Sequence, residues 1–382
     1  MSGSLAERTQ LPAYFIFSFF CTGFVYPVVV SWVWGGGWLQ ARGFVDFAGS
    51  GAVHLIGGTA GLVGAAIVGP RFGMEKDPSK RKDVFSNPEY IEMKKELGDS
   101  FGFEKWIKER IEEPFTPYSY SFVVIGTFIL WVSWIFFNGG STYSMFKPRD
   151  IGTCKIMMNT LIAGAAGGCV AAALKPTVMG TSTPKSRYDV GALCNGILAG
   201  LVGVTAGCGN IQPWAGFIIG LLSGLFYVLG CKLMKKIGVD DPVDASSVHG
   251  ICGAWGLIAT GFFDNSKGLF SGNKKEMGPF FGYQCLGCFC IIVWTASICG
   301  AFFLIFKKLG YLRVTLMEEI IGLDISEMGV EEPKEFRMME AEFSKQLTLL
   351  RKESSQGITS GFHGSLQQVL AGAQEHIKLE KH

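Results

Sequence analysis

The chain has little charge for its length. Of its 382 residues, 17% are Asp, Glu, Lys or Arg, whereas 48% are hydrophobic, and the mean hydropathy is +0.31. Soluble domains usually carry about 25% charged residues. The composition therefore excludes an ordinary pair of soluble domains and indicates a membrane protein. The net charge of +2 is too small for a basic surface that binds nucleic acid, so we expect no such partner.

The sequence also lacks the paired cysteine clusters that bind metals. Eleven cysteines are present, but most lie inside apolar runs, where cysteine packs as a small hydrophobic residue. The spacing Cys285-x-x-Cys288-x-Cys290 has no second cluster to complete a site. The apolar run that follows the first ten residues is too long for the core of a signal peptide. We expect no metal, no cofactor and no cleaved signal.

Long uncharged runs fill most of the chain. A helix needs about 20 apolar residues to cross a bilayer, because its backbone polar groups must be satisfied internally. The runs of suitable length are Leu11–Trp34, Phe47–Pro70, Tyr118–Phe146, Ile156–Leu174, Val190–Cys231, Ala245–Phe263 and Met277–Phe306. The fifth is about twice the length needed and contains Gly-Cys-Gly-Asn-Ile-Gln-Pro at 207–213, a turn signal. We therefore predict an all-α polytopic membrane protein with eight transmembrane helices.

The lysines and arginines of the loops predict the topology. An even number of spans places both termini on one side of the membrane. Most of the loop lysines and arginines fall on the side of the termini, which indicates that both termini are cytoplasmic. The predicted parts are two helices in 1–70, a charged cytoplasmic insertion in 71–117 with two short helices, six helices in 118–306, and a cytoplasmic tail in 307–382.

Histidine is scarce, and only two of the five histidines, His54 and His249, lie in apolar runs. An ionisable ring inside a membrane span is costly, so it usually marks a pathway or a ligand site. Each ring follows a Val-Asp pair and a few small residues, and such similarity between two halves is typical of the inverted repeats of transporters. The predicted topology brings the two rings in from opposite sides. Two imidazoles in a dry passage can share or relay a proton.

Four further residues are candidates for a site. Asp46 and Asp244 lie near the starts of the two histidine-bearing spans, where a carboxylate is expected to cap a helix N-terminus. The alternative for both is a direct part in binding or deprotonating a cation. Trp34 and Ser141 lie at outer span ends. Tryptophans there usually form an interfacial belt, but an indole face with a hydroxyl nearby can also hold a cation.

Several segments in combination resemble the ammonium transporter family (Amt/Mep/Rh), on its Amt side. They are A-E-R-T, V-W-G-G-G, D-F-A-G-S-G-A-V-H, G-L-V-G, W-I-F-F-N-G-G-S, G-L-V-G-V-T-A-G-C, V-D-D-P-V-D-A-S-S-V-H-G-I-C-G-A-W-G and G-L-D-I-S. The form F-A-G-S-G-A-V-H and the tail are closest to plant-type members. The resemblance covers most of residues 4–70 and 118–329.

This resemblance implies an eleven-helix fold of two inverted five-helix repeats, assembled as a homotrimer with one narrow pore per subunit, most often in the plasma membrane. It also implies a regulatory role for the tail. The residues that match the family's pore are His54 and His249 for the twin histidines, Trp34 and Ser141 for ammonium recruitment, Phe137 for a gate ring, Asp46 for support of deprotonation, and Asp244 at the start of the second histidine helix.

The chain starts at what resembles the loop before the family's fourth helix, so eight of the eleven helices are expected. A shortened gene model and a divergent or inactive member both account for this. The implied function is transport, not enzymatic catalysis: ammonium loses its proton at the pore entrance and ammonia passes the two histidines. The alternatives are an ammonium sensor, a non-transporting truncated member, and a haem protein that uses His54 and His249 as axial ligands.

Overall fold

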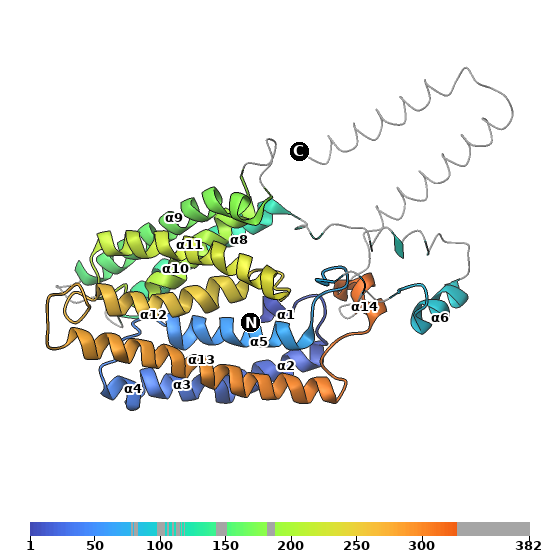
Figure 1. The fold of residues 1–382 in the computed structure, drawn as a ribbon, viewed down its shortest axis with the longest axis horizontal. Coiled ribbons are helices and arrows are strands. Elements are labelled where there is room, and N and C mark those ends of the chain that lie inside the picture. Colours follow the sequence, from blue (N-terminus) through green and yellow to red (C-terminus); the bar gives the residue numbers. More distant parts are fainter. Residues whose placement is uncertain are drawn as a thin grey trace, which may run out of the picture. The chain divides into compact units, whose positions relative to one another are not determined.

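Helices make up the regular structure of the chain (Figure 1). The computed structural model describes residues 1–77, 79, 83–97, 104, 107, 108, 111, 115, 117, 119–142, 151–181 and 188–326. Within these ranges no strand forms, and the extended pairing is an isolated bridge between Thr9 and Arg313. The all-α prediction is therefore confirmed for this part of the chain.

The chain divides into two units, Met1–Leu323 and Asp324–His382. The helices of residues 1–97 are α1 (Ser2–Leu5), α2 (Leu11–Phe20), η1 (Cys21–Val25), α3 (Tyr26–Val33), α4 (Trp38–Ala41), η2 (Ser50–Leu55), α5 (Ile56–Val68) and α6 (Pro88–Leu97), where η marks a π-helical turn. Those that follow are α8 (Tyr120–Gly140), α9 (Ile151–Met179), α10 (Val190–Thr205), α11 (Pro213–Ile237), η5 (Ser246–Ile251), α12 (Cys252–Phe263), α13 (Met277–Lys308), α14 (Leu316–Ile321) and α15 (Leu323–Ser326).

Each of the eight predicted spans contains a helix within its described residues. In the described chain, six helices are long and apolar enough to cross a membrane: Leu11–Ala41, Ser50–Val68, Tyr120–Gly140, Gly152–Met179, Pro213–Ile237 and Met277–Lys308. The other two predicted spans correspond to α10, an apolar helix of 16 residues, and to η5 with α12. These helices carry the fold of a polytopic membrane protein.

The ends of several helices follow from local sequence. The predicted break at 207–213 is confirmed, since α10 ends at Thr205 and α11 begins with Pro213 in its first turn. Asp189 caps α10, because its side chain accepts a hydrogen bond of 3.0 Å from the backbone N–H of Ala192. In the insertion, α6 matches the first of the two expected helices, whereas the second lies largely outside the described residues.

Helices α9, α10 and α11 lie side by side (Figure 1), and small residues occupy their contacts. A methyl group placed on Gly200 of α10 would lie 2.1 Å from the carbonyl oxygen of Ala163 on α9. The corresponding distance from Gly220 of α11 to the same oxygen is 2.3 Å. Both are far below van der Waals contact, so the backbones meet without intervening side chains. The expected close packing through glycine is confirmed at these two positions.

Helix α5, in the N-terminal half of the sequence, and η5, in the C-terminal half, cross with their backbones in close contact. A methyl group on Gly58 would lie 2.0 Å from the backbone nitrogen of Gly250 and 2.4 Å from its Cα atom. Only a residue without Cβ fits there. Because His54 is one turn before Gly58 and His249 directly precedes Gly250, the crossing sets the separation of the two histidine-bearing turns.

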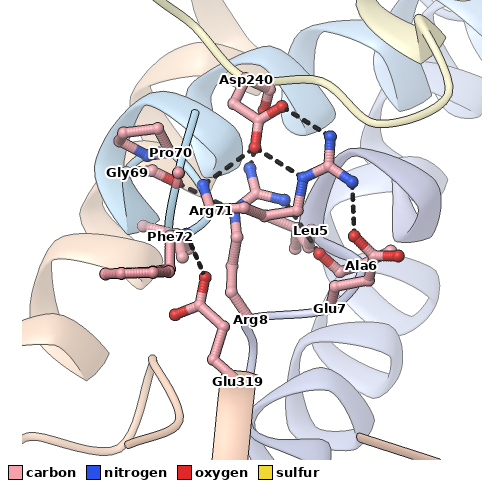
Figure 2. A network of polar contacts seen from close by, with 12 residues as sticks. Leu5, Ala6, Glu7, Arg8, Gly69, Pro70, Arg71, Phe72, Asp240 and Glu319 are labelled. Carbon is pink, nitrogen blue, oxygen red and sulfur yellow. Dashed lines mark hydrogen bonds and ion pairs between the residues drawn. The ribbon is translucent and has the colours of Figure 1, made fainter. Parts of the chain in front are cut away.

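A buried polar network lies where α5 ends (Figure 2). Arg71 donates to the Asp240 carboxylate from Nε at 2.8 Å and from Nη2 at 3.0 Å, and it also pairs with Glu7. Arg8 is fully buried and donates to the carbonyls of Asp240, at 2.7 Å, and Gly69, at 2.9 Å. Burial would raise the pKa of Asp240, but the hydrogen bonds and charge of Arg71 hold this pKa below its usual value. The charges are thus matched within the network.

Substitution of Gly58 tests the helix crossing. Gly58→Ala is expected to destabilise the folded protein by about 1–3 kcal/mol, because the methyl group has no space and the helices must separate. Gly57→Ala is the matched control, since a methyl group there meets no atom within 4 Å. Thermal melting of the two purified variants in detergent measures the difference. Equal melting temperatures would show that the two halves do not meet at this point.

Candidate functional site

Two π-helical turns carry the two buried histidines. His54 lies in η2 and His249 in η5, and each turn leads directly into an α-helix. In η2 the backbone N–H of His54 donates to the carbonyl of Gly49, five residues earlier, at 3.1 Å. Gly49 has a φ of 108°, a left-handed conformation that favours glycine. Single π-helical turns are frequent at functional sites because they redirect side chains within a helix.

The two imidazole rings face each other. Their centroids are 5.3 Å apart and their planes differ by 16°. The Nε2 atom of His54 and the Nδ1 atom of His249 are buried and, within the described chain, make no hydrogen bond to protein. A buried polar atom without a partner is costly. Both atoms therefore have a hydrogen-bonding position open to a small polar molecule.

Aromatic rings of α8 cover His54 on its other side. The ring of Trp134 stacks on His54 with centroids 4.8 Å apart and planes 16° apart, and the ring of Phe137 lies 6.0 Å from His54. Trp134 is fixed by a hydrogen bond of 2.9 Å from its Nε1 atom to Thr205. Trp134 is not among the residues predicted from the sequence. Its position three residues before Phe137, on the same helical face, is the signal that could have found it.

Asp46 anchors the loop before η2 and is almost fully buried, with 3% of its surface exposed. Its carboxylate accepts hydrogen bonds from the backbone N–H groups of Gly49, at 3.1 Å, Gly51, at 3.0 Å, and Ala52, at 2.8 Å. The predicted capping role is therefore confirmed. Burial raises the pKa of Asp46 to about 6, although these hydrogen bonds act in the opposite direction. The carboxylate is thus still mainly ionised at neutral pH.

The same loop positions Trp34. The indole Nε1 atom of Trp34 donates to the backbone carbonyl of Asp46 at 2.7 Å, and the Trp34 side chain is 39% exposed. The loop is in turn tied to the end of α10, since Phe47 and Ala48 donate backbone hydrogen bonds to the carbonyls of Ala206 and Thr205. A partly exposed indole is therefore held by the residue whose carboxylate caps η2.

Ser141 and Phe137 form a separate group at the end of α8. The Ser141 hydroxyl donates to the Phe137 carbonyl at 2.9 Å, and Phe137 is 42% exposed. Phe137 thus links the surface to His54, because its ring lies within 6.0 Å of the imidazole. Ser141 shares no hydrogen bond or ring contact with Trp34 in the described structure, so the two recruitment candidates belong to different elements.

The predicted cap by Asp244 is wrong. The cap is provided by Asp241, whose Oδ2 atom accepts a hydrogen bond of 2.6 Å from the N–H of Ser246. Asp244 has a φ of 57°, and its carboxylate instead accepts hydrogen bonds from Lys175, at 2.7 Å, and Tyr227, at 2.8 Å. These partners could not be found from sequence, because Lys175 is 69 residues away on another helix.

Comparisons with known proteins agree on one family. The family model described as "Ammonium Transporter Family" matches residues 1–88 and 103–332. The chain is 36% identical over 360 residues to "Ammonium transporter 1 member 3" of Solanum lycopersicum, which covers 86% of this chain and 70% of that protein. It is 36% identical over 345 residues to "Ammonium transporter Amt2" of Archaeoglobus fulgidus, with coverage of 86% and 65%.

Solved structures show the same likeness. A structure titled "Sensor Amt Protein" aligns with a TM-score of 0.66 and 29% identity, over 85% of this chain and 72% of that one. Saccharomyces cerevisiae Mep2 aligns with a TM-score of 0.62 and 29% identity, over 80% and 62%. The chain thus spans roughly two thirds of the length of these relatives.

Removal of the Asp46 carboxylate tests its capping role. Asp46→Ala is expected to destabilise the protein by about 1–3 kcal/mol, because buried backbone N–H groups lose their acceptor. Asp46→Asn keeps one acceptor oxygen and should lose less. The melting temperatures of the purified variants in detergent give the comparison. If Asp46→Ala has the same melting temperature as the unaltered protein, the cap contributes no stability.

Proposed function

The chain belongs to the ammonium transporter family, whose members are transporters and not enzymes, and we propose that it conducts ammonia across a membrane. In this proposal ammonium arrives at one mouth of the bundle and gives up its proton there. Neutral ammonia then passes between the helices. The observation that carries the proposal is the face-to-face arrangement of His54 and His249, buried between helices of the two halves.

The surroundings of the two rings favour a neutral solute. Trp134 and Phe137 cover His54, and no carboxylate is recorded in hydrogen-bond contact with either imidazole in the described structure. A cation that enters such an apolar passage is heavily penalised, whereas ammonia is not. Ammonia can exchange hydrogen bonds with the unpaired ring nitrogens as it moves. Potassium has no proton to lose, which provides a basis for discrimination between the two cations.

The proposed entrance combines aromatic faces with a negative charge. Trp34 is partly exposed and can hold ammonium through its attraction to the indole ring, with the Ser141 hydroxyl, directly after α8, as an acceptor. Phe137, whose ring lies 6.0 Å from His54, is the gate. The backbone carbonyl of Asp46 accepts a hydrogen bond from Trp34. The Asp46 carboxylate is mainly ionised at neutral pH, and its negative charge favours a cation near Trp34. Asp244 acts at the other end of the passage, where it holds Lys175 and Tyr227 at the start of η5.

The proposal extends to the assembly and its membrane. A homotrimer in the plasma membrane, with both termini of this chain in the cytoplasm, accords with family membership and with the distribution of loop lysines and arginines. In this orientation the 71–117 insertion and the tail lie in the cytoplasm. The substrate is ammonium or ammonia.

A sensor of ammonium is the second candidate. It is favoured by the structural similarity to the protein titled "Sensor Amt Protein". A sensor would bind ammonium at the same residues but would signal instead of conducting. Net uptake therefore separates the two functions, whereas binding does not.

Uptake in cells that lack ammonium transport tests the proposal. The chain is expected to support growth on scarce ammonium and uptake of labelled methylammonium. His54→Ala is expected to reduce uptake by at least about tenfold, because loss of one ring raises the barrier by about 1.4 kcal/mol or more. Phe122→Ala, on a side chain that is 77% exposed, is the control and should leave uptake unchanged. Ammonium binding without uptake would instead support the sensor.

A further inference from the structure

A small cavity lies where α13 ends, beside the last turn of α5. It has a volume of about 140 Å³ and is lined by Val68, Lys307, Gly310, Leu312 and Arg313. A single water needs only about 10–15 Å³ by a comparable measure, so the cavity has room for a larger group. Gly310 contributes no side chain to fill it. The lining is therefore open and carries two cationic side chains.

The two cations have unused hydrogen-bond donors. The Lys307 ammonium donates to the carbonyl of Ile67, and among the described residues it joins no ion pair. Arg313 donates to the carbonyls of Val68, at 3.1 Å, and Pro70, at 2.8 Å, and pairs with Glu319 at 2.8 Å. These bonds leave two N–H groups of Lys307, and the Nε–H and one Nη1–H of Arg313, free for a ligand. They also cover the exposed carbonyls at the end of α5, which would otherwise repel an anion.

The charge at this cavity is not balanced, in contrast to the neighbouring network of Arg8 and Arg71. That network is closed by Asp240 and Glu7, as Figure 2 shows. At the cavity, Glu319 pairs with Arg313, and in the described structure no carboxylate pairs with Lys307. An anion would complete the pairing that the neighbouring network already has.

The surface next to the cavity is apolar and suits lipid chains. Leu304 and Ile305 on the last turns of α13 are 54% and 56% exposed, and Leu309 is 60% exposed. Tyr311, 63% exposed, follows the helix, at the level where aromatic residues favour a membrane interface. A group bound at Lys307 can therefore extend apolar chains along α13.

We propose that this cavity binds the phosphate of an anionic phospholipid, with the phosphate between Lys307 and Arg313 and the acyl chains along Leu304 and Ile305. A phospholipid headgroup and a free phosphate ion would both present a phosphate group to these two cations. The apolar surface beside it favours the lipid. Basic pockets between helices on the cytoplasmic side are suited to anionic headgroups, since that leaflet carries the negative lipids.

Thermal melting of the purified full chain in detergent tests the site. Added phosphatidylglycerol is expected to raise the melting temperature, whereas phosphatidylcholine at the same concentration is not. Lys307→Gln should raise the lipid concentration for the half-maximal shift by about fivefold, the contribution of one basic residue near an anionic headgroup. Lys307→Arg keeps the charge and should retain the shift, which separates a lost ligand from a damaged fold.

The control is Lys308→Gln, an exposed neighbour that does not line the cavity and should behave like the unaltered protein. If Lys307→Gln and Lys308→Gln weaken the lipid-induced shift in melting temperature equally, general surface charge explains the shift and the proposed site is wrong. In a second experiment, inorganic phosphate is added in place of the lipid and the melting temperature is measured again. A shift with inorganic phosphate as large as with the lipid would overturn the lipid as the source of the phosphate.

Discussion

The backbone contact between Gly58 and Gly250 is the constraint on which the rest of the structure depends. It places α5 against η5 with no side chain between them, and so it fixes η2 and η5 relative to each other. Glycines of α12 repeat the arrangement, since a methyl group on Gly253 would lie 2.7 Å from the Ser50 carbonyl oxygen. One added methylene in such a contact is enough to move helices. The separation of His54 and His249 is therefore set by residues that have no side chain.

Charged groups are placed at the ends of the helices and are satisfied there. Asp46 is held by backbone N–H groups, Asp244 by Lys175, and Asp240 by Arg71. Between these ends the described interior presents two imidazoles and aromatic rings. This distribution avoids the cost of burying unpaired charge between the helices, as the proposed path of a neutral solute requires. The proposed exit of a proton at the mouth follows from the same distribution.

Sequence predicts the helices better than it predicts the contacts between them. The apolar runs and the turn at 207–213 determine the spans, and the scarcity of histidine points to His54 and His249. The π-helical form of η2 and η5 leaves no mark on hydrophobic periodicity, so it could not be anticipated. Partners such as Lys175 for Asp244 depend on helix packing across long sequence separations. Local signals are therefore sufficient for the cap at Asp46 but not for the partner of Asp244.

The central claim is that this chain conducts ammonia through the passage at its two histidines. It is tested most directly with the purified chain in liposomes that enclose a pH indicator, when an ammonium gradient is imposed. The account predicts that the lumen becomes alkaline faster than in protein-free liposomes, because ammonia enters and takes up protons inside. It also predicts that a double substitution of His54 and His249 by alanine removes the difference. A rate for the unaltered chain equal to that of protein-free liposomes would contradict the account.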